Sequence, residues 1–329
     1  MKNKEKVLQI LYQKNGECVS SSEIIAELGI TRSAIFKIIS ELKKQGFDIE
    51  SIHHKGYRLS DTNDIISPEI INSIIKKYGK NKKIQYLESV DSTNTFAKKA
   101  LMDNAFCPEI IIANTQNNGR GRMGRSFYSP ENTGIYCSFI LDPFIKIENS
   151  ILVTVAASVA VSKAIEKVTQ KDTQIKWIND IYIDHRKVCG ILTEAVTDFE
   201  TGMIGKIILG IGINFSTPYS LFPKEISETA TSIFADDNSG ITRNHLIAQL
   251  IIEIDECMNN IENEEIIKYY RKKSMVLGKT LEISYFGKEA PIYGKAVDID
   301  SNGFLIIETN NGLLTLNSGE VSIRQNEEE

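Results

Sequence analysis

Apolar residues in the first sixty positions repeat with the spacing of helices, and this pattern limits the possible folds more than any other part of the sequence. From Ile35 to Leu42, apolar residues recur at the i, i+3, i+4 and i+7 positions of one helix face, behind Thr31 as an N-cap and before Gly46 as a stop. Two earlier apolar stretches predict two more helices, and two strand-like runs afterwards predict a hairpin. This order indicates a winged helix-turn-helix over residues 1–62.

Caps and turns set the limits of the remaining elements in this domain. The second helix is expected to have Ser21 or Ser22 as its N-cap and to end at Gly29. The other expected segments are residues 7–12 for the first helix, with residues 47–50 and 57–59 as two strands around a turn at 53–56.

The third helix of this domain has a polar face opposite its apolar one. Such a helix enters the major groove of DNA, while a wing touches phosphate or the minor groove. Residues 1–60 hold ten Lys and Arg against seven Asp and Glu in a chain of net charge −5, which suits this domain to a polyanion. The alternative is a packing or dimerisation module. The residues expected to contact DNA are Arg32, Ser33, Phe36, Lys37, Ser40, His54 and Lys55.

A polar linker at residues 60–67 precedes two further regions, which fits two or three domains in 329 residues. Residues 67–275 mix strand-like and helical runs, and short turns between several runs predict antiparallel pairing. Residues 276–325 contain short β-like runs broken at 301–303 and 310–312, which predicts a small barrel of five or six strands. The expected fold class is α+β. Expected central strands are 110–113, 135–141, 175–177, 181–183, 188–194 and 206–215, with helices at 151–168 and after Thr242.

Cysteine usage and hydropathy indicate a cytoplasmic protein without a membrane partner. The five cysteines are odd in number and never spaced as CxxC, which argues against a disulfide framework or a zinc site. The longest apolar stretch, residues 151–161, is much shorter than the roughly 20 residues of a membrane span. The charged N-terminus lacks the apolar region of a signal peptide.

The segment of residues 116–125, Gln-Asn-Asn-Gly-Arg-Gly-Arg-Met-Gly-Arg, carries the clearest chemical signal. Its glycines let the backbone approach a ligand closely, and its arginines bring positive charge to that backbone. Together they are suited to phosphate, although the spacing is neither that of a P-loop nor of a dinucleotide-binding loop. A flexible, solvated loop is the alternative reading of this composition.

Four shorter motifs accompany this arginine loop. They are Asp-Ser-Thr-Asn at 91–94, Lys-Trp-Ile-Asn-Asp at 176–180, Arg-Lys-Val-Cys-Gly-Ile-Leu at 186–192 and Gly-Ile-Gly-Ile-Asn at 210–214. In this order, the five motifs resemble those of the bifunctional biotin protein ligases that also act as biotin operon repressors. The resemblance covers nearly the whole chain and implies a catalytic domain of the biotin/lipoate ligase type at 67–275 and an SH3-like barrel at 276–325.

The chain departs from the family pattern at two positions. Ile178 stands where the family usually has proline, and Phe127 stands where it often has a tryptophan that stacks on adenine. The smaller ring of Phe127 predicts weaker stacking.

The resemblance assigns roles residue by residue. Arg122 and Lys187 are the expected catalytic cations, and Asn179 and Asp180 are expected to orient a metal or the lysines. Biotin is expected at Ser92, Thr93, Asn94, Gln116, Gly119, Arg120, Arg122, Lys187 and Gly190, and the adenylate at Arg120, Arg122, Arg125, Phe127, Lys187 and Asn214.

The same resemblance implies a reaction and partners. Biotin and ATP, with Mg²⁺, are expected to give biotinyl-5′-AMP, from which biotin passes to a lysine of a biotin carboxyl carrier domain. A mobile arginine loop is expected to order over the adenylate. Operator DNA and a homodimer formed with bound biotinyl-adenylate are the other expected partners. A lipoate or octanoate ligase and a regulator that only senses a ligand remain alternatives.

Overall fold

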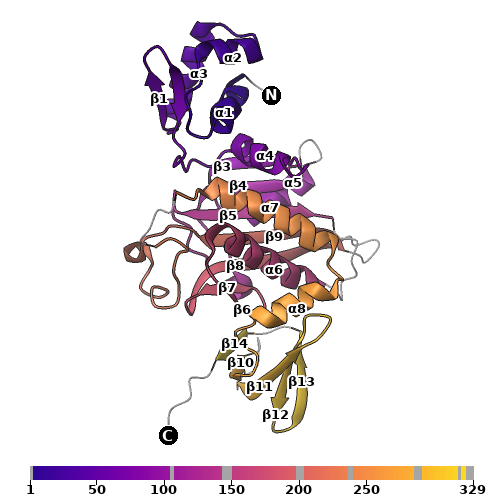
Figure 1. The fold of residues 1–329 in the computed structure, drawn as a ribbon. Coiled ribbons are helices and arrows are strands. Elements are labelled where there is room, and N and C mark those ends of the chain that lie inside the picture. Colours follow the sequence, from indigo (N-terminus) through magenta and orange to yellow (C-terminus); the bar gives the residue numbers. More distant parts are fainter. Residues whose placement is uncertain are drawn as a thin grey trace.

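The computed structural model describes residues 3–103, 107–142, 150–197, 204–235, 240–284, 291–317 and 320–323. The chain forms three bodies in sequence order, with a helical domain at one end, a large α/β body in the middle and a small sheet at the other end (Figure 1). This α+β architecture is the one that the sequence predicts. Across the described ranges, every helix is too short or too polar to cross a membrane.

The N-terminal domain is a winged helix-turn-helix, as predicted. Thr31 caps its third helix by accepting a hydrogen bond from the backbone of Ala34. The expected cap of the second helix is wrong by one or two residues, because Ser20 and Glu23 form a reciprocal capping box that starts the helix there. The elements are α1 (Asn3–Gln13), α2 (Ser21–Leu28), α3 (Arg32–Lys44), β1 (Ile49–Ile52) and β2 (Gly56–Leu59).

The middle body is built on a seven-stranded sheet of order β3-β4-β5-β9-β8-β7-β6. The pairs joined by short turns are antiparallel, as predicted, whereas β3 and β4 are parallel because α5 crosses between them. The strands are β3 (Ile84–Val90), β4 (Ile110–Gln116), β5 (Gly134–Leu141), β6 (Gln174–Lys176), β7 (Asp180–Ile183), β8 (Arg186–Thr197) and β9 (Ile204–Asn214).

Helices α6 (Ser150–Thr169) and α7 (Arg243–Asn259) lie together across one face of this sheet (Figure 1). Nearly every apolar residue of both helices is buried, and they form one core with the strand residues that face them. Thr242 is the N-cap of α7 by position, although its side chain makes no capping hydrogen bond. The remaining helices of this body are α4 (Pro68–Lys76), α5 (Thr93–Met102), α8 (Glu264–Lys273) and the 3-10 turns η1 (Arg122–Gly124) and η3 (Tyr219–Leu221).

The linker at residues 60–67 is bonded to the start of α7. Arg243 is buried, and its guanidinium donates to Asp64 Oδ2 at 2.7 Å and to the Asp64 carbonyl at 2.8 Å. Asn244 accepts a hydrogen bond from the backbone of Ser67 at 2.9 Å. The winged helix adds a direct contact, since the Tyr12 hydroxyl lies 3.1 Å from His245 Nε2. The linker therefore holds a defined position on the middle body.

The C-terminal region is a five-stranded antiparallel sheet of order β13-β12-β11-β10-β14. A buried hydrogen bond of 3.0 Å from the Trp177 indole to the Gly303 carbonyl ties it to the middle body. This bond is close to the functional motifs, because Trp177 lies within the Lys-Trp-Ile-Asn-Asp segment. The strands are β10 (Thr280–Ser284), β11 (Ile292–Ile299), β12 (Leu305–Thr309), β13 (Gly312–Leu316) and β14 (Glu320–Ile323).

Candidate functional site

A cavity of about 390 Å³ lies between the arginine loop and the sheet face opposite α6 and α7. Strand alternation explains why this face is open. Ile211 and Ile213 of β9 point into the core with α6, so Gly210, Gly212 and Asn214 point to the other side. Their neighbours in register, on β5 and β8, include further small residues.

Protein side chains occupy the room that the glycines of this face provide. A Cβ at Gly212 would lie 2.5 Å from the ring of Phe127, and one at Gly210 would lie 2.3 Å from Asn94 Oδ1. A Cβ at Gly190 would come within 3.2 Å of Lys187 Nζ. Gly210 and Gly212 are therefore required by the close packing of Asn94 and Phe127 on the sheet, whereas at Gly190 the flexible Lys187 side chain would have to shift only slightly.

The arginine loop is a structured turn, held at its base by backbone hydrogen bonds. Phe127 donates to the Gly119 carbonyl at 2.8 Å, and Gly121 donates to the Arg125 carbonyl at 2.7 Å. At its tip, Met123 adopts a positive φ of 56° and is 49% exposed. Ordering of this loop over a bound adenylate stays a prediction.

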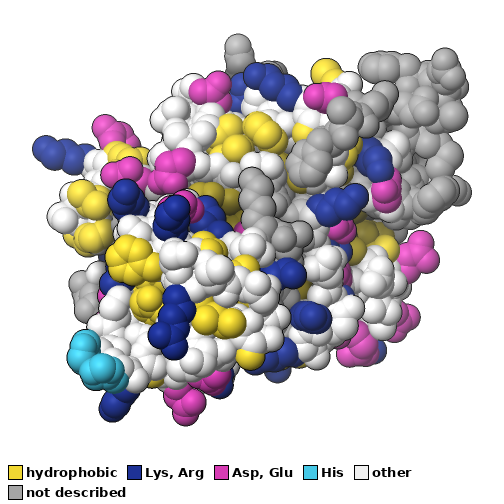
Figure 2. All heavy atoms as spheres, turned by 90° about the horizontal axis from the view of Figure 1, so that it is seen from above, with side chains coloured by type: hydrophobic (Ala, Val, Ile, Leu, Met, Phe, Trp, Pro, Cys, Tyr) yellow, Lys and Arg dark blue, Asp and Glu magenta, His cyan; other side chains and the backbone are white. Residues whose placement is uncertain are grey.

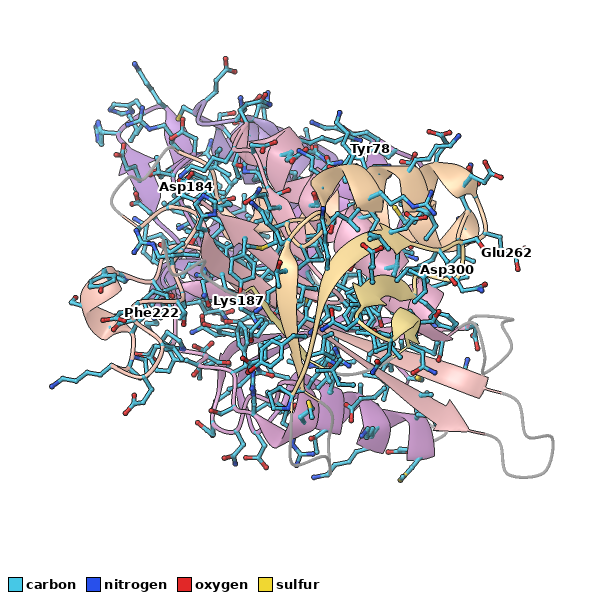
Figure 3. The ribbon with its side chains drawn as sticks, turned by 90° about the horizontal axis from the view of Figure 1, so that it is seen from below. Tyr78, Asp184, Lys187, Phe222, Glu262 and Asp300 are labelled. Atoms are coloured by element: carbon cyan, nitrogen blue, oxygen red, sulfur yellow. The ribbon has the colours of Figure 1, made fainter. Side chains whose placement is uncertain are left out.

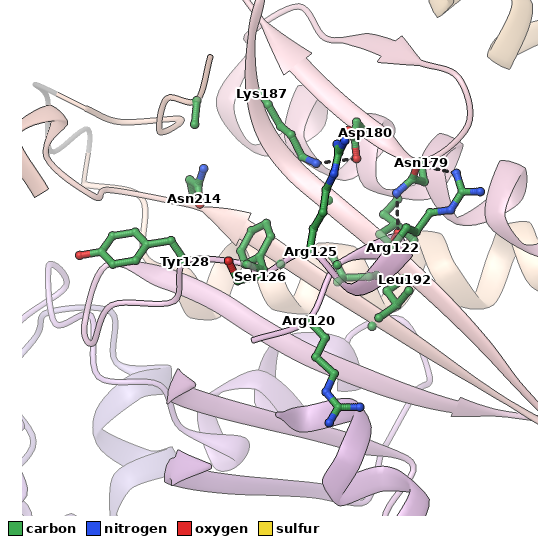
Figure 4. Close-up of a pocket in the computed structure, with 18 of the residues that line it drawn as sticks. Arg120, Arg122, Arg125, Ser126, Tyr128, Asn179, Asp180, Lys187, Leu192 and Asn214 are labelled. Carbon is green, nitrogen blue, oxygen red and sulfur yellow. Dashed lines mark hydrogen bonds and ion pairs between the residues drawn. The ribbon is translucent and has the colours of Figure 1, made fainter. Parts of the chain in front are cut away.

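Two cations of the cavity are paired with the Asn-Asp end of the Lys-Trp-Ile-Asn-Asp motif. Lys187 Nζ lies 2.7 Å from Asp180 Oδ1, and Arg122 Nη1 donates to Asn179 Oδ1 at 3.2 Å. Figure 4 shows the guanidinium of Arg125 directed toward this group. Asn179 and Asp180 therefore each contact one of the two expected catalytic cations.

Positive charge dominates the cavity wall. Among its described lining residues, five are Lys or Arg and the single carboxylate is Asp180. The chain as a whole has a net charge of −5, so the cations are concentrated here against the overall balance. Such a site attracts an anionic ligand and stabilises negative charge that develops in a reaction.

Arg120 differs from the other arginines of the loop. Its side chain is exposed and, in Figure 4, extends away from Lys187 and Asp180. Gly119 is the one expected ligand-binding residue outside the cavity lining, and it lies at the base of the loop beside an outer groove. The other expected ligand-binding residues thus line the cavity together, whereas the Arg120 side chain extends away from them and Gly119 lies outside the lining.

A hydrogen-bonded polar cluster forms the end of the cavity beside α5. Gln116 Oε1 accepts from the backbone N–H of Thr93 at 2.9 Å, and Asn94 Nδ2 donates to Glu194 Oε2 at 2.8 Å. The hydroxyl of Ser138 lies 2.6 Å from Asn94 Oδ1 and 2.7 Å from Thr93 Oγ1. Sequence reasoning missed both Ser138 and Glu194. Glu194 lies two residues after the cavity-lining Leu192 on β8, and Ser138 pairs in register with the cavity-lining Gly210.

The segment before α7 closes the adenine side of the expected site. Thr231 donates to the Lys187 carbonyl at 2.9 Å, and Lys187 donates to the Thr229 carbonyl at 2.8 Å. Asn214 Nδ2 donates to the Thr231 carbonyl at 3.1 Å. This short bridge, which sequence reasoning also missed, fixes Lys187 and Asn214 relative to each other.

The thiols near this site are buried rather than reactive. Burial raises the pKa of Cys137 to about 12, and it raises the pKa of Cys189 well above the ordinary thiol value. All five cysteines are free, as the sequence predicts. In the described part of the chain, no group of three or more His, Cys, Asp and Glu could hold a metal ion.

The surface expected to meet DNA lies on the winged helix, away from the cavity. Figure 2 looks onto that end of the molecule and shows Lys and Arg side chains interspersed with exposed apolar ones, with histidine at one edge. Phe36 is 67% exposed, and Arg32, Ser33, Lys37, His54 and Lys55 are also exposed, whereas Ser40 is half-buried. Figure 3, from the opposite side, shows Lys187 within the middle body.

Three known families match the three regions of the chain. Residues 86–214 match the biotin/lipoate A/B protein ligase family, residues 3–58 match a helix-turn-helix domain, and residues 277–324 match the biotin protein ligase C-terminal domain.

Individual relatives match over almost the full length. The bifunctional ligase/repressor BirA of Bacillus subtilis is 31% identical over 96% of this chain and 97% of the relative. The Escherichia coli protein of the same name is 26% identical over 95% of each chain. Among solved structures, biotin protein ligase from Aquifex aeolicus in complex with biotin and ATP is 29% identical, with a TM-score of 0.62 over 74% of this chain and 99% of that one.

Proposed function

Because this chain belongs to the biotin protein ligase family and is a biotin–protein ligase, we propose that it makes biotinyl-5′-AMP and passes biotin to a lysine of a biotin carboxyl carrier domain. The observation that carries the proposal is the cationic cavity beneath the arginine loop. In it, Arg122 contacts Asn179 and Lys187 contacts Asp180, two adjacent residues at the start of β7.

The first half-reaction joins two anions, which explains the need for these cations. A carboxylate oxygen of biotin attacks the α-phosphorus of ATP, the bond to the bridging oxygen of the β-phosphate breaks, and pyrophosphate leaves. Arg122 and Lys187 lower the repulsion between the carboxylate and the triphosphate and stabilise the charge of the transition state. Asp180 and Asn179 hold both cations in place.

The second half-reaction needs a nucleophile from another protein. The acceptor lysine amine attacks the carbonyl carbon of the mixed anhydride, AMP leaves with the electron pair of the broken C–O bond, and the amine loses a proton. An arginine loop that orders over the adenylate excludes water until the acceptor arrives.

Magnesium fits this site as a companion of ATP. It is usually held through one or two carboxylates together with substrate phosphates, and Asp180 with Asn179 can supply one carboxylate and one amide oxygen. Both residues already bind cationic side chains, so we expect the ion to arrive with the nucleotide. When bound, Mg²⁺ neutralises part of the triphosphate charge.

A transfer assay tests the ligase and separates it from its nearest alternative. Purified protein, MgATP and an isolated biotin carrier domain are incubated with labelled biotin, lipoate or octanoate, and a carrier domain with its target lysine changed to arginine is the control. We expect ATP-dependent labelling with biotin alone. Labelling with lipoate or octanoate instead identifies a different acyl ligase, and labelling with none leaves a ligand-sensing regulator.

We also propose that the winged helix binds operator DNA and represses transcription as a dimer that forms with biotinyl-adenylate. The exposed face around Phe36 and Lys37 supports this, as do the relatives named ligase/repressor. For the dimer, β3 is the more open of the two edge strands of the seven-stranded sheet. Among the described residues β3 pairs only with β4, whereas the other edge strand, β6, pairs with β7 and also forms a bridge to Ser274.

DNA binding is tested with the full chain and a matched pair of variants. Lys37→Ala removes a cation from the expected DNA face, and Lys76→Ala removes a cation from α4 that is also exposed. We expect the first to weaken binding and to reduce the slope of log affinity against log salt by about one, and the second to do neither. Equal behaviour of the two variants contradicts a DNA role for this face.

A further inference from the structure

Ser129 joins both ends of the arginine loop, although it lies outside the cavity lining. The residue is 5% exposed. Its hydroxyl accepts a hydrogen bond of 3.0 Å from Gln116 Nε2 and donates one of 3.0 Å to the Phe127 carbonyl. Its own carbonyl accepts a bond of 2.8 Å from the Thr115 hydroxyl. One small side chain thus contacts the residue that opens the loop and a residue near its end.

The position of Gly119 shows that this arrangement is built into the loop. A Cβ at Gly119 would lie 2.7 Å from Ser129 Oγ and 2.4 Å from the Phe127 carbonyl oxygen. Any larger residue at Gly119 would therefore push the Ser129 hydroxyl off its two partners. Packing within the loop therefore requires a glycine at position 119, independently of any contact with a ligand.

The other end of the Gln116 amide is also held. Gln116 Oε1 accepts from the Thr93 backbone N–H at 2.9 Å and from the Thr93 hydroxyl at 3.2 Å. With Nε2 directed at Ser129, the amide is fixed at both ends, and this determines which group it turns to the cavity. Buried chains of hydrogen bonds of this kind hold their members more firmly than single bonds do.

We propose that Ser129 is a positioning residue for recognition of the biotin head, acting through the Gln116 amide. This inference rests on the proposed ligase function, and the family resemblance implies that Gln116, with Ser92, meets the ureido group of biotin. The ureido group has donors and an acceptor, so an amide fixed in one orientation recognises it and disfavours an acid that lacks such groups. Ser129 therefore contributes to the selection of biotin over a dithiolane or a plain alkyl chain.

The same geometry predicts that loss of the Ser129 hydroxyl raises the KM for biotin more than the KM for ATP. Without the hydroxyl, Gln116 keeps its two bonds from Thr93, but its Nε2 loses its partner and the amide can pivot. Phe127 keeps its own backbone bond to the Gly119 carbonyl at 2.8 Å, so the adenine end changes less. Arg122 and Lys187 are not touched by Ser129, so the chemical step should proceed at its usual rate.

The test compares Ser129→Ala with Ser129→Thr and with Ser162→Ala in steady-state adenylation. Ser162 is a matched control, because it is a fully buried serine whose hydroxyl bonds Thr173 and Tyr269 instead. For Ser129→Ala we expect the KM for biotin to rise about five- to thirty-fold, the loss that one part-buried hydrogen bond brings. The KM for ATP and kcat should stay within about two-fold, because the groups that act there are retained.

Each outcome decides the proposal. Recovery of the biotin KM in Ser129→Thr, together with an unchanged biotin KM in Ser162→Ala, supports it, as does a fall in the preference for biotin over lipoate in Ser129→Ala. An unchanged biotin KM in a folded Ser129→Ala, or an equal rise in Ser162→Ala, overturns it. If the unaltered protein forms no adenylate, the proposed function itself fails. If Ser129→Ala does not fold, Ser129→Thr decides the question, and a KM for biotin that is raised above that of the unaltered protein overturns the proposal.

Discussion

Replacing Arg243 by methionine should weaken the attachment of the linker to the middle body. The side chain is 3% exposed, and it makes two close hydrogen bonds with Asp64, at 2.7 and 2.8 Å. Its weaker bonds reach Asn114 at 3.3 Å and the Gly134 carbonyl at 3.4 Å. Methionine has a similar length and no donor, so the four acceptors lose the guanidinium, although Asn114 Oδ1 keeps its hydrogen bond from the Asn132 backbone N–H at 3.1 Å.

The expected loss can be sized from burial. Breaking a buried ion pair by removing one partner costs about 3–5 kcal/mol. Asp64 remains 33% exposed and can regain water, so the lower end, about 3 kcal/mol, is expected. Arg271 is a suitable control, because it also joins two bodies through a carbonyl and a carboxylate but is 37% exposed. An exposed pair of this kind is worth about 0–1 kcal/mol.

Urea unfolding followed through Trp177, the one tryptophan of the chain, compares Arg243→Met with Arg271→Met. Limited proteolysis then measures access to residues 60–67. We expect a clear fall of the unfolding midpoint and faster cleavage of the linker for Arg243→Met, with little change for Arg271→Met. Equal midpoints for the two variants, or an unchanged rate of linker cleavage in Arg243→Met, would show that Arg243 does not hold the linker on the middle body.

Three further changes follow from single contacts. Lys187→Ala should lower the rate of adenylate formation about 10²- to 10³-fold in a pyrophosphate-exchange assay, the usual loss for one group that stabilises transition-state charge, and a rate within ten-fold of normal would exclude that role. Gly212→Ala should displace the Phe127 ring, whose carbon lies 2.5 Å from the added Cβ. Steady-state kinetics should then show a higher KM for ATP and little change for biotin, and the reverse pattern would place adenine elsewhere. Burial lowers the pKa of His245 below its ordinary value of 6.5, so the unfolded chain takes up the proton first and stability should fall as pH drops below that value. His245→Gln should flatten this fall in urea titrations at several pH values, and an unchanged pH dependence would show that other groups cause it.

Elements with a strong period could be predicted from the sequence, and elements set by distant partners could not. Helix α3 follows from the spacing of Ile35 to Leu42 and from Thr31, which are all local. The parallel pairing of β3 with β4 depends on the path of α5, which no local pattern specifies. The capping box at Ser20 was missed, although Glu23 three residues later is a readable signal.

The site shows the same division. Gln116, Arg122, Lys187 and Asn214 lie in motifs that could be read directly, and the structure brings them to one cavity. Ser138 sits in an apolar strand, where its side of the sheet depends on register with neighbouring strands. Such partners act across the sheet, so a single sequence without the fold does not reveal them.

Contacts across long sequence separations explain the rest. Arg243 and Asp64 are 179 positions apart, and nothing near either residue indicates the other. Their pairing depends on where α7 begins relative to the linker. The attachment of the winged helix to the catalytic body was therefore beyond sequence reasoning, whereas the presence of both bodies was not.

Formation of the adenylate intermediate is the step on which the proposed ligase function depends, and it can be measured without an acceptor protein. Purified full-length protein is incubated with biotin and MgATP in the absence of acceptor, the protein is denatured, and the released ligand is measured by mass spectrometry, with Lys187→Ala and lipoate in parallel. Activation of biotin by this chain should give biotinyl-5′-AMP with an equal amount of pyrophosphate from the unaltered protein, far less from the variant, and no lipoyl adenylate. A folded protein that binds biotin and ATP yet yields no biotinyl-5′-AMP would contradict it.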